Sequence, residues 1–276
     1  MPTHTLKVGD AEVIALADMP MQIPYEIFFP GVPRAEIDGY EERYPGSWSN
    51  GMFYTHVSAY AVRSQGQTIL CDTGFGPGPI AFLNNARGEM LNDMRAKGVD
   101  PASVDIVVHT HLHGDHVGWN LAPDGKPNFP SARFIAPQAD WDHFNADLQN
   151  QAQMQQVMPL HEMGLLELVS GEKAINSEVT TYPTPGHTPG HQSIMVTSGG
   201  ERILITGDLA HHPAQVDQPD WCSAFDIDQQ VTARTRADMF AQLEADGIKV
   251  AFCHFPEAPF GELVRVGTRR IWQAVS

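Results

Sequence analysis

The stretch Ile106-Val107-Val108-His109-Thr110-His111-Leu112-His113-Gly114-Asp115-His116-Val117-Gly118 joins three apolar, β-forming residues directly to four histidines and one aspartate. A run of Ile and Val is typical of a buried strand. Imidazole and carboxylate groups are common ligands of transition metals, and a solvated surface has no need to concentrate them in this way. The pattern therefore favours a metal site at the C-terminal end of a strand over a chance histidine-rich loop.

Length, composition and charge limit what kind of protein this chain can be. The 276 residues are 42% hydrophobic, which suffices for one large core, so a single domain is expected over residues 1–276. A formal net charge of −16, from 17 Lys and Arg against 33 Asp and Glu, repels phosphate backbones and anionic membrane surfaces. We therefore expect no nucleic-acid or membrane partner. Three irregularly spaced cysteines and an N-terminus without an apolar leader favour a cytoplasmic protein.

Strand and helix patterns alternate along the chain, as they do in α/β folds. Helices are expected at 88–97 and 228–246, where apolar residues recur at helical spacing. Two successive halves, each with strands followed by helices, indicate two packed sheets with helices outside. The expected strands are 5–8, 11–17, 56–63, 68–71, 104–109, 132–136, 165–169, 178–182, 191–197, 202–206, 248–253, 262–266 and 269–274.

Two segments depart from this alternation. Residues 19–56 form an arm in which five prolines interrupt any period, yet the arm is too aromatic for a disordered linker. It is expected to pack on its own domain, on a second subunit or over a pocket, and a homodimer is expected on this basis. Residues 137–163 are rich in Gln and are expected to form a helical insertion, with a stripe of Met and aromatic residues on one side.

Further ligand-type side chains follow other expected strands. His187 comes from the rigid turn Pro183–His191, Asp208 follows the strand at 202–206, and His254 follows the strand at 248–253. With His111, His113, Asp115 and His116 they make five imidazoles and two carboxylates, which is too many for one tetrahedral ion. Two divalent ions about 3.5–4 Å apart, bridged by a carboxylate and a hydroxide, would use them all. Zn, Fe, Co, Mn or Ni suits this mixed donor set.

The pattern H-x-H-x-D-H at 111–116, followed by His187, Asp208 and His254, resembles the metallo-β-lactamase superfamily over about residues 56–254. The resemblance implies an αββα sandwich of two mixed β-sheets flanked by helices, with the metal site at one sheet edge. It also implies that two zinc ions are the expected cofactor and that Asp72 supports the ligands from behind. In this family the ligand assignment would be His111, His113 and His187 for one ion, Asp115, His116 and His254 for the other, and Asp208 for both.

Several departures narrow the branch within the family. The bridging Asp208 argues against the true β-lactamases, and His113 argues against the flavodiiron oxygen reductases, which carry Glu there. The context Pro185–His191 is shared by the N-acyl-homoserine lactonases and the methyl-parathion-hydrolase-like group. The lactonases carry a Tyr three residues after the bridging Asp, where this chain has His211. That difference, with the stretch Phe225–Asp228, favours the methyl-parathion-hydrolase-like group.

The resemblance implies a dinuclear metal-dependent hydrolase whose bridging hydroxide cleaves a small neutral lactone or ester, such as an N-acyl-homoserine lactone. Organophosphates are possible promiscuous substrates. The alternatives are a thioesterase, a β-lactam hydrolase or, outside hydrolysis, a di-iron redox protein. Asp115 is the candidate proton shuttle and His211 a candidate donor, while His109 and His191 are interpreted as supporting residues. An apolar pocket is expected. Its candidate residues are Phe28, Phe29, Trp48, Phe75, Trp119, Trp141 and Phe225.

Overall fold

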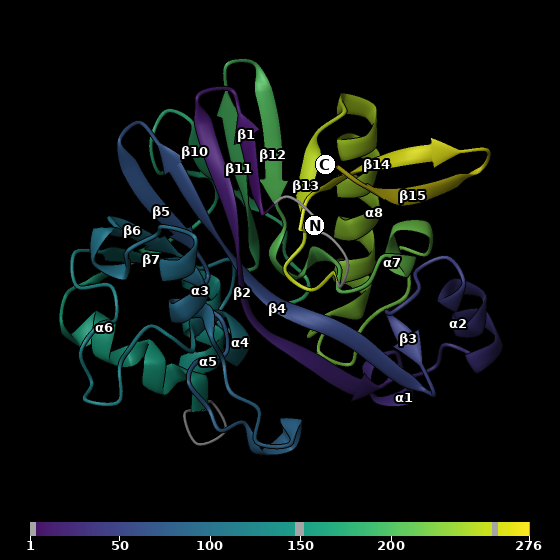
Figure 1. The fold of residues 1–276 in the computed structure, drawn as a ribbon, viewed down its shortest axis with the longest axis horizontal. Helices are drawn as coiled ribbons and strands as arrows, with labels where there is room; N and C mark the ends of the chain where they lie inside the picture. Colours follow the sequence, from purple (N-terminus) through teal and green to yellow (C-terminus); the bar gives the residue numbers. More distant parts are fainter. Residues whose placement is uncertain (1–3, 147–151, 256–258, 276) are drawn as a thin grey trace.

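The computed structural model describes residues 4–146, 152–255 and 259–275, and their strands form two mixed sheets packed face to face (Figure 1). The expected fold class is therefore confirmed. The first sheet has the order β1-β2-β4-β5-β6-β7-β8, with β3 paired to β4, and the second has the order β15-β14-β13-β12-β11-β10-β9. Strands β5 to β8 run parallel to one another, and so do β12 and β13, whereas the other neighbours are antiparallel.

Each strand expected from the sequence is present; the strands at 5–8 and 269–274 have the expected ends, and the others have shifted ends. The strands of the first sheet are β1 (Thr5–Val8), β2 (Ala11–Pro24), β3 (Trp48–Ser49), β4 (Met52–Ser64), β5 (Gln67–Cys71), β6 (Ile106–Val108), β7 (Arg133–Pro137) and β8 (Leu166–Val169). Those of the second are β9 (Lys173–Ala174), β10 (Val179–Pro183), β11 (Gln192–Ser198), β12 (Glu201–Ile205), β13 (Lys249–Ala251), β14 (Gly261–Val266) and β15 (Arg269–Ala274).

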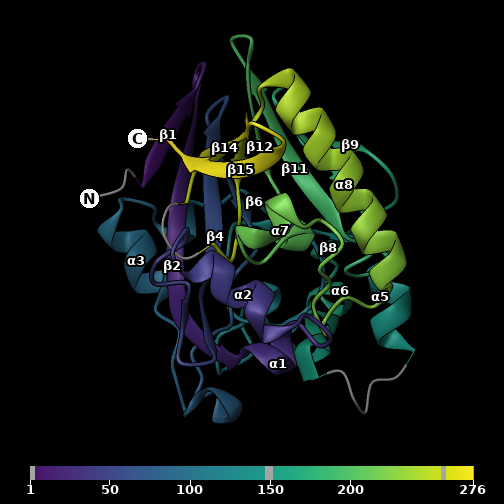
Figure 2. The ribbon, with the colours of Figure 1, turned by 90° about the vertical axis from the view of Figure 1, so that its right-hand side faces the viewer.

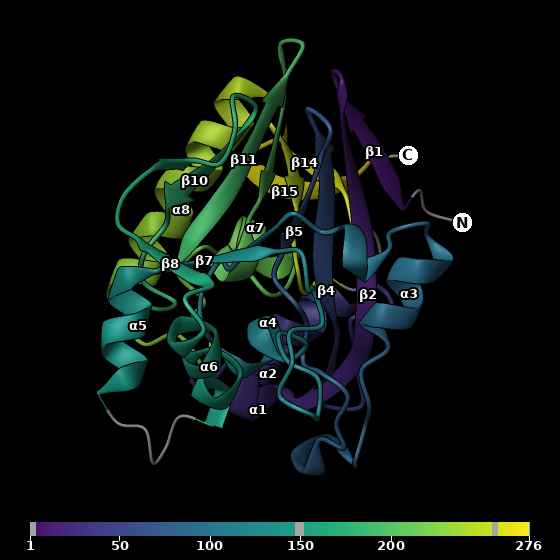
Figure 3. The ribbon, with the colours of Figure 1, turned by 90° about the vertical axis from the view of Figure 1, so that its left-hand side faces the viewer.

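Helices cover the outer faces of both sheets. Figure 2 shows α8 along the second sheet, and Figure 3 shows α3, α5 and α6 beside the first. The α-helices are α1 (Tyr25–Phe28), α2 (Arg34–Glu41), α3 (Met90–Ala96), α4 (Gly114–Val117), α5 (Gln138–Asn145), α6 (Met158–Glu162), α7 (Ala214–Asp217) and α8 (Gln229–Asp246). Short 3₁₀ helices are η1 (Ala81–Leu83), η2 (Pro101–Ser103), η4 (Ala152–Gln156) and η5 (Gly207–Leu209). None of the helices in the described ranges is long and apolar enough to cross a membrane.

Continuous apolar strands are needed because both faces of each sheet are buried. In β6, Ile106 and Val108 face the layer between the sheets, whereas Val107 packs with α3. In β12, Ile203 and Ile205 face the same inner layer, and Leu204 packs with α8. The two sheets are thereby fixed against each other, so that the C-terminal ends of β6, β12 and β13 can share one edge.

The prolines of the arm at 19–56 suggested an irregular segment, but part of the arm is regular β-structure. Strand β2 continues through Pro20 to Pro24 and pairs with β4, past a register shift between Ala17 and Met19. The prolines are tolerated because, in the described part of the chain, the ladder with the N-terminal strand ends at Ala15, so at Pro20 and Pro24 β4 is the one paired strand.

The arm packs on its own domain. Phe29 and Phe53 are fully buried against Trp48, and Phe29 also contacts Trp221 beyond the second sheet. Figure 1 shows α2 and β3 beside α7, where Tyr40 donates a hydrogen bond to Asp217 at 2.8 Å. The expected homodimer stays a prediction.

The insertion at 137–163 is helical where it is described, in α5, η4 and α6. Residues 147–151 of the expected helix lie outside the described residues. Phe144 of α5 and Met154 of η4 pack with Leu112 and Val117, which flank the histidine cluster. The insertion therefore forms one wall behind the loop that follows β6.

Candidate metal centre

Four strand ends deliver the expected ligands to one place. His111 and His113 lie in the loop after β6, and Asp115 and His116 lie on α4. His187 lies in the turn between β10 and β11. Asp208 lies in η5 directly after β12, and His254 follows β13. The structure brings all seven side chains together, and they make up two donor groups of possible ligands; Asp208 also groups with His211 and His254.

The first donor group contains His111, His113, His187 and Asp208, and the second contains Asp115, His116 and His254; the donor atoms within each lie within 4.8 Å of one another. Asp208 lies between the groups. Its Oδ2 atom is 3.2 Å from His187 Nε2, and its Oδ1 atom is 3.2 Å from His116 Nε2 and 3.1 Å from His254 Nε2. Each carboxylate oxygen thus faces one group, which is the arrangement that a bridging ligand requires.

The outer nitrogen of several imidazoles is occupied by an acceptor. The acceptors are the Asp72 carboxylate for His116 at 2.8 Å, the Asp226 carboxylate for His187 at 2.8 Å and the His56 carbonyl for His254 at 2.7 Å. In each case Nδ1 meets the acceptor and Nε2 faces the centre. Such pairing fixes the tautomer and orientation of a metal-binding histidine. Although burial opposes it, Asp208 raises the pKa of His116, His187 and His254, so a cation bound at Nε2 would replace the proton there.

The donor set fits a cation. His113 Nδ1 lies 3.1 Å from His111 Nε2 and 2.9 Å from His187 Nε2, so three ring nitrogens converge. Burial, with the neighbouring imidazoles, holds the pKa of His111 and His113 well below the ordinary value. These two rings are therefore neutral at pH 7, and their lone pairs are available to a divalent ion.

The buried carboxylates carry the matching negative charge. Burial alone would raise the pKa of Asp208, but the surrounding imidazoles, His116 and His254 first, hold it well below its usual range. Burial likewise opposes ionisation of Asp226, yet its hydrogen bond to His187 lowers its pKa to about 2. Both groups are ionised at neutral pH and can serve as a ligand and as an acceptor, respectively.

Asp72 could act either as a cap of the turn or as a support for a metal ligand. It has a φ of 63° directly after β5, and its carboxylate accepts the N–H and the Oγ1–H of Thr110, each at 2.8 Å. It also accepts from His116. Asp72 therefore caps the turn and orients a histidine at the same time.

His109 and His191 lie behind the donor groups. Asn120 Nδ2 donates to His109 Nε2 at 3.1 Å. His191 Nε2 accepts the backbone N–H of Asp208 at 2.9 Å, while its Nδ1–H donates to the Thr184 carbonyl at 2.9 Å. Burial lowers the pKa of His191 to about 3, so the ring stays neutral and can accept. Its place is consistent with holding the backbone of Asp208.

Two supporting carboxylates were not identified from the sequence. Asp226 lies in the noted stretch Phe225–Asp228 but had no role assigned, and Asp140 lies in the helical insertion. Asp226 meets His187 across 39 positions of sequence. No local pattern distinguishes such a residue from an ordinary loop aspartate, whereas its burial in the folded chain does.

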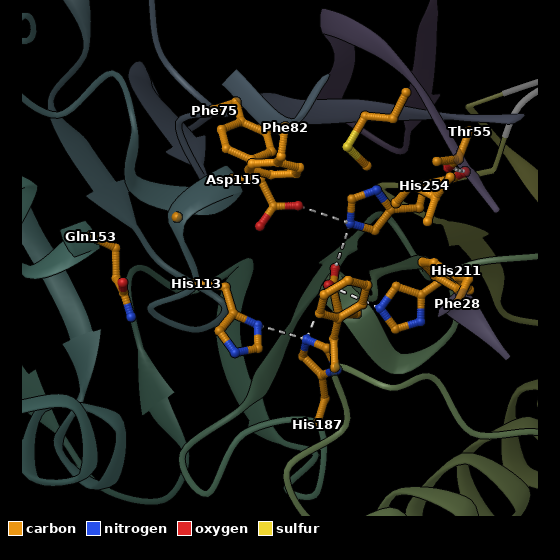
Figure 4. A pocket seen from close by; sticks show the side chains of 15 residues that line it. Phe28, Thr55, Phe75, Phe82, His113, Asp115, Gln153, His187, His211 and His254 are labelled. Atoms are coloured by element: carbon orange, nitrogen blue, oxygen red, sulfur yellow. Dashed lines mark hydrogen bonds and ion pairs between the residues drawn. The ribbon is translucent and has the colours of Figure 1, made fainter. Parts of the chain in front are cut away.

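A pocket of about 220 Å³ opens over the donor groups (Figure 4). His113, Asp115, His187, Asp208, His211 and His254 form its polar floor. The remaining lining residues are mostly apolar: Met21, Ile23, Phe28, Thr55, Phe75, Phe82, Gly114, Gln153 and Phe225.

The structure places three of the seven aromatic candidates, Phe28, Phe75 and Phe225, in the pocket lining. The other four lie elsewhere: Phe29 and Trp48 in the core beneath the arm, Trp119 with its Nε1–H donated to Asp18 at 2.8 Å, and Trp141 stacked on His161. Met21, Ile23 and Phe82 were missed. The first two lie in the part of β2 beyond its expected end.

His211 lies at the pocket floor beside both donor groups. Its Nε2 atom is 3.2 Å from Asp208 Oδ2. The ring is held edge-on by Phe28, with ring centroids 5.3 Å apart, and stacks on His254 at 5.4 Å. Burial lowers the pKa of His211, although Asp208 opposes this. The imidazole therefore has a fixed orientation from which it can meet a bound molecule.

Comparisons with known proteins agree with this geometry. The family model described as the metallo-beta-lactamase superfamily matches residues 53–253. An N-acyl homoserine lactonase of Bacillus thuringiensis is 25% identical over an alignment of 174 residues, with 56% of this chain and 64% of the relative covered. The lactonase AttM of Rhizobium radiobacter is 27% identical over 134 residues, 44% of this chain and 47% of the relative. The matches thus span less than two thirds of these curated relatives.

Solved structures match over nearly the whole chain. The hydrolase AbOPH, of the beta lactamase superfamily, has a TM-score of 0.87 and 25% identity, covering 100% of this chain and 98% of that one. AidC, described as a dizinc quorum-quenching lactonase in complex with a product, has a TM-score of 0.86 and 21% identity, covering 99% and 97%. At that identity the likeness to AidC concerns the fold alone.

We expect the purified protein to contain about two divalent ions per chain, because each donor group can hold one. His113→Ala should lower the content towards one ion, and Asp208→Ala should lower it further, because Asp208 faces both groups. Elemental analysis by mass spectrometry measures this. The exposed His161, away from the pocket, provides the control variant His161→Ala. Metal content near zero in the wild type, or equal in all variants, would contradict the assignment.

Proposed function

Because this chain belongs to the metallo-β-lactamase superfamily, we propose that it is a metal-dependent hydrolase of small neutral lactones or esters. The observation that carries the proposal is the placement of Asp208 between two donor groups at the floor of an apolar pocket. The similarity to relatives named as N-acyl homoserine lactonases and to the hydrolase AbOPH also supports a hydrolase of this kind.

In this proposal the two donor groups hold two divalent ions, with Asp208 shared between them. The mixed nitrogen and oxygen donors suit zinc best among the expected metals, although Fe, Co, Mn or Ni would also be accepted. Once bound, such a pair of ions supplies a water-derived nucleophile at neutral pH and a Lewis acid for the substrate oxygen. The remaining steps fall to the side chains around the pocket.

The pocket lining selects a neutral, largely apolar substrate. Among the described lining residues there is no Lys or Arg, whereas Asp115 and Asp208 contribute negative charge. A polyanionic substrate would meet no cationic side chain there. Met21, Ile23 and Phe28 would instead bury an acyl or aryl group and exclude water from the reacting bond. This favours a lactone or simple ester over a thioester with a charged carrier.

Asp115 is placed to carry a proton. Its side chain is 20% exposed at the pocket, and its Oδ2 atom lies 3.7 Å from His254 Nε2 and 3.8 Å from His116 Nε2. The carboxylate would accept the proton that the nucleophilic water releases and pass it to the leaving oxygen. General acid–base transfer of this kind contributes about 10²- to 10⁴-fold to enzymatic rates.

His211 would orient the substrate. Its ring is fixed by Phe28 and His254, and its Nε2 nitrogen faces the pocket floor beside Asp208. As an N–H donor it would hold the substrate carbonyl or leaving oxygen, at the position where the resembling lactonases carry a tyrosine. The reaction class would be unchanged by this exchange, whereas the preferred leaving group would differ.

A side-by-side assay of five substrate classes tests the proposed function. An N-acyl homoserine lactone, an aryl ester, a phosphotriester, a thioester and a β-lactam should be ranked by kcat/KM. We expect the lactone or the aryl ester to rank first, with the phosphotriester cleaved more slowly. The double variant His113→Ala, Asp208→Ala should be inactive on all five. A thioester or β-lactam ranked first, or full activity in the double variant, would overturn the proposal.

The role of His211 predicts a defect in kcat without a loss of metal. His211→Phe keeps an aromatic ring against Phe28 but removes the N–H donor, and kcat should fall about 10²-fold, as for the loss of one oxyanion donor. His211→Tyr returns a donor and should recover part of the rate on lactones. Steady-state kinetics with parallel metal analysis measures both. An unchanged kcat, or loss of an ion in His211→Phe, would rule out this role.

A further inference from the structure

Asp140 is a buried carboxylate of α5 that has no place in the proposed reaction. It is 0% exposed, and burial raises the pKa of its carboxyl group. Three donors converge on it. The N–H of Leu112 and the Oγ1–H of Thr188 each lie 2.9 Å from Oδ2, and the N–H of Gly190 lies 2.6 Å from Oδ1.

These donors belong to the two loops that supply the first donor group. Leu112 lies between His111 and His113, and Thr188 directly follows His187. One carboxylate therefore holds together the loop after β6 and the turn between β10 and β11, which come from different sheets. Gln192 also joins the two loops, since its backbone N–H and side-chain amide donate to the carbonyls of Thr110 and His109. Of these connections, Asp140 is bonded to the residues directly beside His111, His113 and His187.

The glycine of this turn permits the close approach. A Cβ atom at position 190 would lie 2.7 Å from the backbone nitrogen of Asp140 and 2.8 Å from its Oδ1 atom. Any larger residue would push the turn away from α5. The second half of the motif Pro185–His191 is thereby explained by its contact with Asp140, which the ligand role of His187 alone does not explain.

The second donor group is supported by other residues. His116 donates to Asp72, and His254 donates to the carbonyl of His56. None of the three hydrogen bonds of Asp140 described above reaches a residue next to Asp115 or His254. Asp72 and Asp208 are common to both groups, since Asp72 also accepts from Thr110 beside His111. The three hydrogen bonds of Asp140 described above, in contrast, lie with the first group.

We propose that Asp140 is a positioning residue for one metal ion only, the ion held by His111, His113 and His187. By fixing the distance between the two loops, it sets the affinity of that position and leaves the other position unchanged. The inference rests on the dinuclear centre of the proposed function and adds to it that the first position has a support of its own, through which it can be weakened without the second.

The test is a competitive titration of Zn²⁺ against a chelator, with Asp140→Asn compared with the wild type. An asparagine has one acceptor oxygen, so at least one of the three donors would face an NH₂ group. We expect one ion to bind about 10- to 100-fold more weakly, the usual effect of losing such a support. The affinity for the other ion should stay within about twofold of the wild-type value. A general loss of stability would weaken the binding of both ions.

Two backgrounds identify the affected ion. In Asp115→Ala the remaining tight ion is the one bound by the first group, and Asp140→Asn should weaken it. In His113→Ala the remaining ion belongs to the second group, and Asp140→Asn should leave it unchanged. Asp142→Asn, an exposed substitution on the same helix, is the matched control and should change neither ion. An equal effect in both backgrounds, or none, overturns the proposal.

Thr188 gives a second route that leaves the buried carboxylate intact should Asp140→Asn fold poorly. Thr188→Val removes one donor without changing shape and should weaken the same ion, whereas Thr188→Ser should restore it. A Thr188→Val protein with unchanged affinities would count against the proposal. A wild type that binds fewer than two ions overturns the dinuclear function as well, whereas a two-ion wild type with an unaffected Asp140→Asn overturns the role of Asp140 alone.

Discussion

The Asp208 carboxylate faces two donor groups at once, and most of the architecture can be understood from that constraint. One oxygen meets His187, and the other meets His116 and His254 at 3.1–3.2 Å. These ligands come from both sheets, so the sheets must be held face to face with their strand ends at one edge. The apolar strands, buried on both faces, provide that rigidity.

Behind the ligands lies a layer of buried groups that fixes them. Asp72, Asp226 and the carbonyl of His56 each hold the outer nitrogen of one imidazole, and His191 holds the backbone of Asp208. Buried polar groups of this density are stable only when each has a partner. His111 and His113 are neutral, whereas Asp208 raises the pKa of His116, His187 and His254. A divalent ion would take the place of the protons on these three rings as the positive charge. Metal binding and the stability of this region should therefore be coupled.

Much of the fold and the placement of the ligands could be predicted, because both depend on local pattern. The strand at 106–108 is followed within a few residues by His111 and His113, and this pattern alone indicates a metal site. His187, Asp208 and His254 also follow strands. The pocket could not be predicted in the same way. Phe28 and Phe29 are adjacent and equally apolar, yet one lines the pocket and the other is fully buried beneath the arm. Which of the two side chains lines the pocket depends on how the arm packs on the second sheet.

The supporting carboxylates and the extent of β2 were missed for a related reason. Asp140 and Asp226 act across long sequence separations, and nothing beside them identifies their partners. Pro20 and Pro24 argued against a strand, because a proline is excluded from a central position; among the described residues, no strand pairs with the other edge of β2 at that point. In each case a tertiary contact determines the structure, and the local sequence pattern does not reveal that contact.

The central claim is that Asp208 is shared by two ions. Crystals of the metal-loaded protein, measured by anomalous diffraction at the absorption edge of the bound metal, test it most directly. The account predicts two peaks about 3.5–4 Å apart on either side of Asp208. One peak should lie against His111, His113 and His187, and the other against Asp115, His116 and His254. A single peak, or two peaks that do not share Asp208, would contradict it.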